Sequence, residues 1–143
     1  MKRTIVTIAT AFLTFSMNAQ ITIKAEPKTE TVWQPSKLSN LPNLTMLQVN
    51  LDTAYAFYYK NMEYTHITDI NHILLGDKET AVQFFEILKK VSSGDNGNKV
   101  VIELDGYTWS IMKASWTVQV YRSGSFFYLN SSQVDSILEK LKQ

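Results

Sequence analysis

The chain contains no cysteine, and that absence excludes several kinds of chemistry at once. Without a thiol there can be no disulfide, no thiol chemistry and no lipid-modified cysteine. Proline is nearly as scarce, with three residues in the whole chain. Pro27, Pro35 and Pro42 all lie between Gln20 and Asn43. The prolines therefore set one segment apart from the rest of the sequence.

Charge is missing from Ile5 to Phe15, an apolar run of 11 residues that follows Lys2 and Arg3. This layout, with the small residue Ala19 further on, is typical of a secretory signal peptide. A membrane-spanning helix needs about 20 apolar residues, so a permanent transmembrane anchor is disfavoured. The sequence therefore predicts a signal peptide over residues 1–19 and an exported protein, periplasmic or extracellular. A buried N-terminal helix is the alternative for the same pattern.

Arginine is rare, because only Arg3 and Arg122 are present. Loss of residues 1–19 leaves 12 cationic against 13 anionic side chains, a net charge of −1. Nucleic-acid-binding domains carry a basic surface and use arginine to contact phosphates in a bidentate way. A nucleic-acid partner is therefore not expected.

Residues 20–48 have no sustained apolar period and contain every proline. This composition is typical of an extended tail or linker, so we expect such a segment ahead of a single domain over residues 49–143. Trp33 stands out within it, because a tryptophan gains little in a flexible tail and is a candidate for docking on a partner. Packing of the segment on its own domain is the alternative.

Two helices are predicted from apolar residues at i, i+3, i+4 and i+7. The first covers residues 78–91 after the capping residue Asp77, and the second lies within residues 130–143, with polar caps from Asn130 to Ser132. Strand-like alternation fills much of the remaining domain, and Asp105-Gly106 joins two such runs with a strong hairpin signal. The expected order is β-β-α-β-β-β-β-α. It predicts an α+β fold with an antiparallel sheet of about six strands and two helices on one face.

A weak internal similarity relates residues 54–92 to residues 116–143. YKNMEY at 59–64 aligns with YRSGSF at 121–126, and residues 77–90 align with residues 130–143. Both segments are predicted to run strand, turn, strand, helix. The two are either degenerate repeats or segments that share this pattern by convergence.

The two histidines of the chain, His66 and His72, lie in EYTHITDINH at residues 63–72 with Glu63 and Asp69. The β-branched residues of this stretch favour a strand. Side chains alternate on a strand, so the histidines would face one side and the acids the other. We therefore expect neither a metal site nor a cofactor, although a bend between Asp69 and His72 would make the histidines weak metal candidates.

No catalytic residue is predicted. Glu103 and Asp105 are the only close carboxylate pair on a predicted strand and turn, about 6.6 Å apart, and a glycosidase-like pair needs about 5 to 9 Å. Ser123 and Ser125 lack the Gly-x-Ser-x-Gly elbow of a serine nucleophile. A small hydrolase that uses Glu103 with Asp105, or His66 with Asp69, is the enzymatic alternative.

Aromatic and hydroxyl side chains supply candidate binding residues instead. Alternation predicts one sheet face that is apolar and a second that carries Thr108, Ser110, Met112, Thr117, Gln119 and Tyr121. A second group crowds the first hairpin, where not all aromatic residues can be buried. The candidate binding residues are Tyr58, Tyr59, Tyr121, Thr117, Gln119 and Trp33.

The sequence therefore favours a non-enzymatic exported domain that binds a protein, a peptide or a glycan. Besides the hydrolase, the open alternative is a subunit of a larger envelope assembly, tethered through the segment around Trp33. A fold of this outline hosts many functions and does not choose among them.

Overall fold

The computed structural model describes residues 28–36, 41–49 and 51–143. The predicted signal peptide, residues 1–19, and its cleavage after Ala19 lie outside these residues. Among the helices of the described residues, none is long and apolar enough to cross a membrane.

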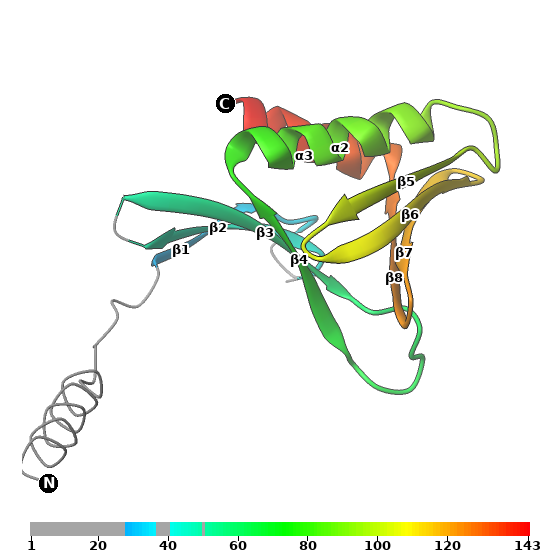
Figure 1. Cartoon of the computed structure of the whole chain (residues 1–143), viewed down its shortest axis with the longest axis horizontal. Helices are drawn as coiled ribbons and strands as arrows, with labels where there is room; N and C mark the ends of the chain where they lie inside the picture. The colour runs from blue at the N-terminus through cyan, green and yellow to red at the C-terminus, as the bar shows by residue number, and fades with distance from the viewer. Residues whose placement is uncertain (1–27, 37–40, 50) are drawn as a thin grey trace, which may run out of the picture.

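The protein is built from two halves with the same order of elements (Figure 1). The N-terminal half comprises β1 (Lys28–Trp33), β2 (Asn43–Val49), β3 (Asp52–Lys60), β4 (Ile70–Gly76) and α2 (Lys78–Ser92). The C-terminal half comprises β5 (Lys99–Leu104), β6 (Tyr107–Ala114), β7 (Thr117–Arg122), β8 (Ser125–Asn130) and α3 (Ser131–Lys142). Each set of four strands forms an antiparallel sheet in sequence order. The fold is therefore α+β, with two sheets and two helices.

The prediction of about six strands in one sheet is corrected to eight strands in two sheets. The additional strands, β1 and β2, lie in the segment 20–48 that was expected to be an extended linker. Pro35 follows β1 and Pro42 precedes β2, so the prolines flank these strands without interrupting them. Among the side chains whose burial is described, β1 contributes one buried residue, Trp33, and β2 contributes one, Leu44. One buried residue makes no detectable period, which is why the pattern resembled a linker.

The helices begin where the sequence predicts. At the start of α2, the Asp77 carboxylate accepts a hydrogen bond of 2.8 Å from the backbone N–H of Thr80. At the start of α3, Asn130 and Gln133 form a capping box in which each side chain accepts from the other residue's backbone N–H. Lys89 and Lys90 lie in the last turn of α2, where the helix dipole favours cations. The capping signals therefore fixed both helix starts.

The C-terminal hairpins also follow the sequence. Asp105 and Gly106 join β5 to β6 with positive φ angles of 54° and 73°. Glycine adopts such an angle without a steric cost, and aspartate tolerates it better than most residues. Ser123 and Gly124 join β7 to β8. The first hairpin differs, because β3 ends at Lys60 and β4 begins only at Ile70. Residues 61–69 form a connecting loop, so the strand expected across residues 63–72 is limited to its last three residues.

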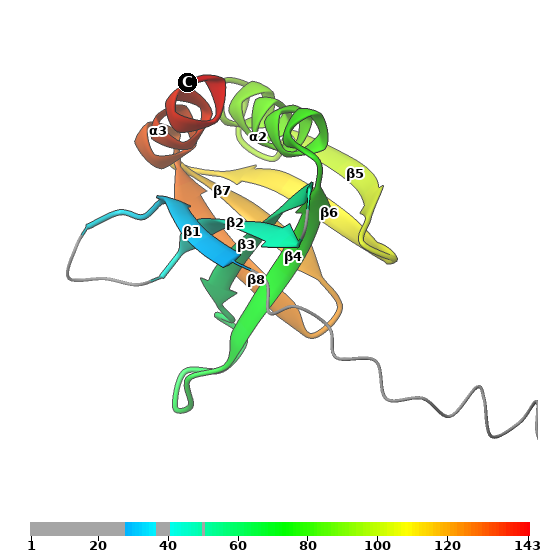
Figure 2. The same cartoon turned by 90° about the vertical axis from the view of Figure 1, so that its left-hand side faces the viewer.

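One hydrophobic core joins the two halves. The helices lie side by side against the inner faces of the sheets (Figure 2). Phe57 of β3 packs against Phe85 of α2 and Phe127 of β8, with ring centroids 5.6 and 5.3 Å apart. Tyr59 stacks on the same Phe127 at 4.3 Å. Because single residues contact both halves, neither sheet has a separate core.

The β3–β4 connection and the β7–β8 turn lie at the end of the sheets away from the helices (Figure 1), and buried polar side chains link them. The hydroxyl groups of Tyr59 and Ser125 are 2.7 Å apart and share a hydrogen bond. Asn61, which is fully buried, donates to the backbone carbonyl of Gly124 and accepts from the backbone N–H of Phe126. The adjacent backbone N–H of residue 62 donates to the carbonyl of Phe126 at 2.9 Å. Satisfied polar groups thus hold the β3–β4 loop against the β7–β8 hairpin.

The proposed internal similarity aligns structurally equivalent elements. The match of residues 59–64 with 121–126 sets the β3–β4 connection over the β7–β8 turn. The match of residues 77–90 with 130–143 sets Asp77 over Asn130, the two helix N-caps. The shared order also includes β1-β2 and β5-β6, which the sequence similarity did not cover. A duplication remains a prediction.

Candidate functional site

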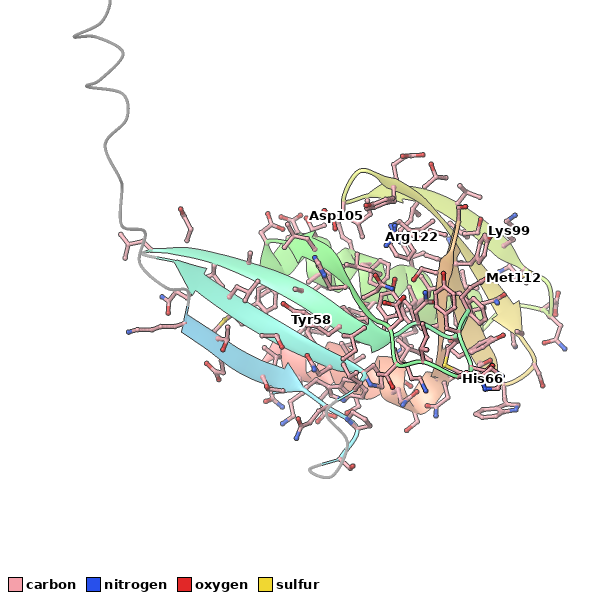
Figure 3. All side chains as sticks on the ribbon, turned by 90° about the horizontal axis from the view of Figure 1, so that it is seen from below. Tyr58, His66, Lys99, Asp105, Met112 and Arg122 are labelled. Carbon is pink, nitrogen blue, oxygen red and sulfur yellow. The ribbon has the colours of Figure 1, made fainter. Side chains whose placement is uncertain are left out.

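The face of the C-terminal sheet that points away from the helices carries two rows of side chains. Strand register places these side chains in line across all four strands. The first row is Lys99, Met112, Gln119 and Tyr128, and the second is Val101, Ser110, Tyr121 and Phe126. We call these eight side chains the outer face. Figure 3 shows Lys99 and Met112 next to each other on this sheet.

Several apolar and aromatic members of the outer face are exposed. Val101 is 56% exposed, Tyr121 is 43% exposed and Tyr128 is 41% exposed. Phe126 is half-buried and meets Tyr128 edge-to-face, with ring centroids 5.6 Å apart. The Tyr128 hydroxyl accepts a long hydrogen bond of 3.4 Å from Gln119. The face therefore combines aromatic area with hydroxyl and amide groups, as protein-binding surfaces do.

The opposite side of the same sheet faces the hydrophobic core. Trp109, Ile111, Val118 and Val120 are fully buried there. Alternation along β6 and β7 predicted this division of faces, and the structure agrees with it for these four residues. Trp116 departs from it, because it lies in the β6–β7 turn and is 74% exposed.

Gln119 and Tyr121, two of the predicted binding residues, lie on the outer face. Thr117 lies at its end, where its hydroxyl donates to the backbone carbonyl of Ala114 at 3.0 Å. The sequence interpretation missed Val101, Phe126 and Tyr128. The alternation in SFFYL carried the signal for the last two, because Phe127 and Leu129 are buried and Phe126 and Tyr128 must then face outward.

The other predicted binding residues lie elsewhere and do not converge. Tyr59 is buried in the junction, whereas its neighbour Tyr58 points to the far side of the N-terminal sheet and lies against His72, with ring centroids 5.6 Å apart. Figure 3 shows Tyr58 on the N-terminal sheet, well apart from Met112. Trp33 is 6% exposed, and its indole N–H donates to the Ser136 hydroxyl at 3.0 Å. It is a core residue, so it is not accessible for tethering to a partner.

In the loop that contains His66, Asp69 binds two neighbouring side-chain amides. One carboxylate oxygen of Asp69 accepts from the side-chain amides of Asn61 and Asn71, each at 3.0 Å. His66 is exposed in the loop, where Figure 3 places it, and His72 is exposed on β4. Within the described ranges, no group of three or more histidine, cysteine, aspartate or glutamate residues could hold a metal.

Glu103 and Asp105, the close carboxylate pair, each accept a hydrogen bond from a different partner. Glu103 accepts a hydrogen bond from the Thr108 hydroxyl on the outer side of the sheet. Asp105 accepts from the backbone N–H of Leu74 at 3.1 Å and so caps the free edge of β4. The two side chains therefore have different hydrogen-bond partners.

Comparisons with known proteins add no assignment, because no family model, no curated protein and no solved structure matches the chain.

Proposed function

We propose that this protein is a non-enzymatic binding module that recognises another protein through the outer face of its C-terminal sheet. The observation that carries the proposal is the exposure of Val101, Tyr121 and Tyr128, on a sheet side that no helix of the described residues covers. The charge pattern of Lys2, Arg3 and the following apolar run supports export, so we propose a periplasmic or extracellular location.

The chemistry of the face favours a protein or peptide partner. Tyrosine supplies a large, fairly rigid contact area, and methionine adapts its shape to a partner. Tyr121, Phe126 and Met112 lie on three adjacent strands, so a partner that contacts all three would cover the centre of the sheet. Binding energy in protein interfaces is concentrated in such central aromatic side chains.

The test is capture of partners with the full-length protein, tagged at its C-terminus, from the culture medium and envelope of the source cells. We expect a stoichiometric partner, with affinity reduced roughly tenfold or more in Tyr121→Ala. Tyr64→Ala is the matched control, because Tyr64 is the same residue type with 46% exposure in the β3–β4 loop. Affinity should be unchanged in this variant.

Three outcomes would contradict the proposal. Equal loss in Tyr121→Ala and Tyr64→Ala would place the interface elsewhere. Loss only in Tyr58→Ala would move it to the N-terminal sheet. Binding to a glycan array without a protein partner would change the ligand class.

A further inference from the structure

Arg122 is the only arginine among the described residues, and it lies on the side of the C-terminal sheet opposite the outer face. The centre of its guanidinium lies 4.0 Å from the centroid of the Tyr107 ring and 5.3 Å from that of Trp109. Tyr107 is 48% exposed and Trp109 is buried. Together they form an aromatic shelf against which the guanidinium lies.

The guanidinium lacks an anionic partner within the part of the chain that the structure describes. The two ion pairs there join Lys89 to Asp135 and Lys142 to Glu86. The Arg122 Nε–H is buried and has no acceptor. Asp105 lies at the same end of the sheet, as Figure 3 shows, but its carboxylate accepts from the backbone N–H of Leu74.

An unpartnered donor on a half-buried cation lowers stability unless something compensates for it. A methionine would fill the same space on the shelf without that penalty. Every other cation after Arg3 is a lysine. Arg122 is therefore the one later side chain that can offer a carboxylate two donors in one plane.

We propose that Arg122 and Tyr107 form a binding site for a carboxylate of a ligand. A carboxylate accepts two parallel hydrogen bonds from a guanidinium in its own plane. Because Nε–H is buried, such a carboxylate would bond to the two Nη groups, and it would supply the negative charge that the site lacks. The ligand class is a peptide that presents either a free C-terminus or an acidic side chain. The proposal does not depend on the outer face, and the two can fail separately.

The test uses the resonance of the Arg122 Nε–H group in nuclear magnetic resonance spectra of the full chain. Only two arginines exist, so Arg122→Lys assigns the signal by its disappearance. Acetate should shift the Arg122 resonance in a saturable way, compared with chloride at equal ionic strength. N-acetylglycine, which mimics a chain terminus, and N-acetylglutamic acid α-amide, which mimics an acidic side chain, then distinguish the two sources.

Variants separate binding from folding. In Tyr107→Leu, which keeps an apolar shelf, the dissociation constant for acetate should rise roughly fivefold. In Arg122→Lys, the backbone amides of residues 123–125 should respond more weakly than in wild type, because lysine is a point charge without the planar pair. In Arg122→Met, the amide response should vanish while the melting temperature stays equal or rises. No saturable shift beyond the chloride control, a shift with inorganic phosphate alone, or equal amide responses in wild type and Arg122→Met would each overturn the proposal.

Discussion

Asn61 links the two sheets through a fully buried side chain. Its side chain makes four hydrogen bonds: it donates to Asp69 and to the Gly124 carbonyl, and accepts from the backbone N–H groups of Glu63 and Phe126. All of its hydrogen-bonding capacity is therefore used inside a buried site. A side chain of similar size without both donor and acceptor groups could not replace it.

We expect Asn61→Ala to lower the free energy of unfolding by about 2 to 4 kcal/mol, because the Gly124 carbonyl and the Phe126 N–H lose the buried side chain that bonds to both. Chemical denaturation measures this change. Asn71→Ala is the control, since its side chain donates to the same Asp69 carboxylate from a half-buried position and should cost about 1 kcal/mol or less. Equal losses in the two variants would show that the junction adds nothing beyond a local loop contact.

Tyr58 and Tyr59 show how adjacent aromatic residues come to lie on opposite faces of a strand. Tyr58 and Tyr59 are neighbours on β3, yet one faces outward and the other is buried. The sequence showed that the two must face opposite sides of the sheet. It did not show which side would meet Phe127, because that contact comes from the other half of the chain.

At the scale of elements, the start of each helix is stabilised by its own capping residue. A hydrogen bond from the Thr80 backbone N–H, together with one from its side chain, lowers the pKa of Asp77 below its ordinary value of 3.8. A lowered pKa means that the folded state favours the charged carboxylate. The stabilisation it gives is present above pH 3.8 and is lost as the pH falls through the folded-state pKa.

Asp77→Asn keeps a capping side chain but removes the charge. We therefore expect wild type to melt at a higher temperature than this variant at neutral pH, and the difference to shrink on acidification below pH 3.8. Thermal unfolding followed by circular dichroism across the acidic range measures the difference. A gap that stays constant with pH would contradict an electrostatic contribution from the cap.

The strands differ in how far their local sequence predicts them. β5 to β8 were predictable from alternation and from the Asp105-Gly106 turn, because each strand of this sheet closes a short hairpin with its neighbour. β1 and β2 are joined by nine residues, and among the side chains whose burial is described each has one buried residue. Their strand identity depends on pairing: β3 supplies partners along all of β2, and β2 in turn pairs with β1.

At the scale of the whole molecule, one core implies one unfolding unit. Phe57, Phe85 and Phe127 come from three different elements and pack together. We expect the slowest-exchanging amides of β3 and β7 to exchange with the same free energy, equal to that of global unfolding. Native-state hydrogen exchange measures both. A lower value for β3 would show that the N-terminal sheet opens by itself.

The amino-acid sequence by itself determined the two helices, their caps, the C-terminal hairpins and the apolar and mixed sides of the second sheet. Each of these depends on residues within about four positions of one another, through capping, turn conformation or side-chain alternation. Tertiary structure alone decided that Trp33 is buried on Ser136, that Asn61 joins the sheets, and that Arg122 lies on Tyr107 without an ionic partner among the described residues. These features depend on contacts between residues that lie far apart in the chain or on separate strands, and local hydrophobic periods carry no information about such contacts.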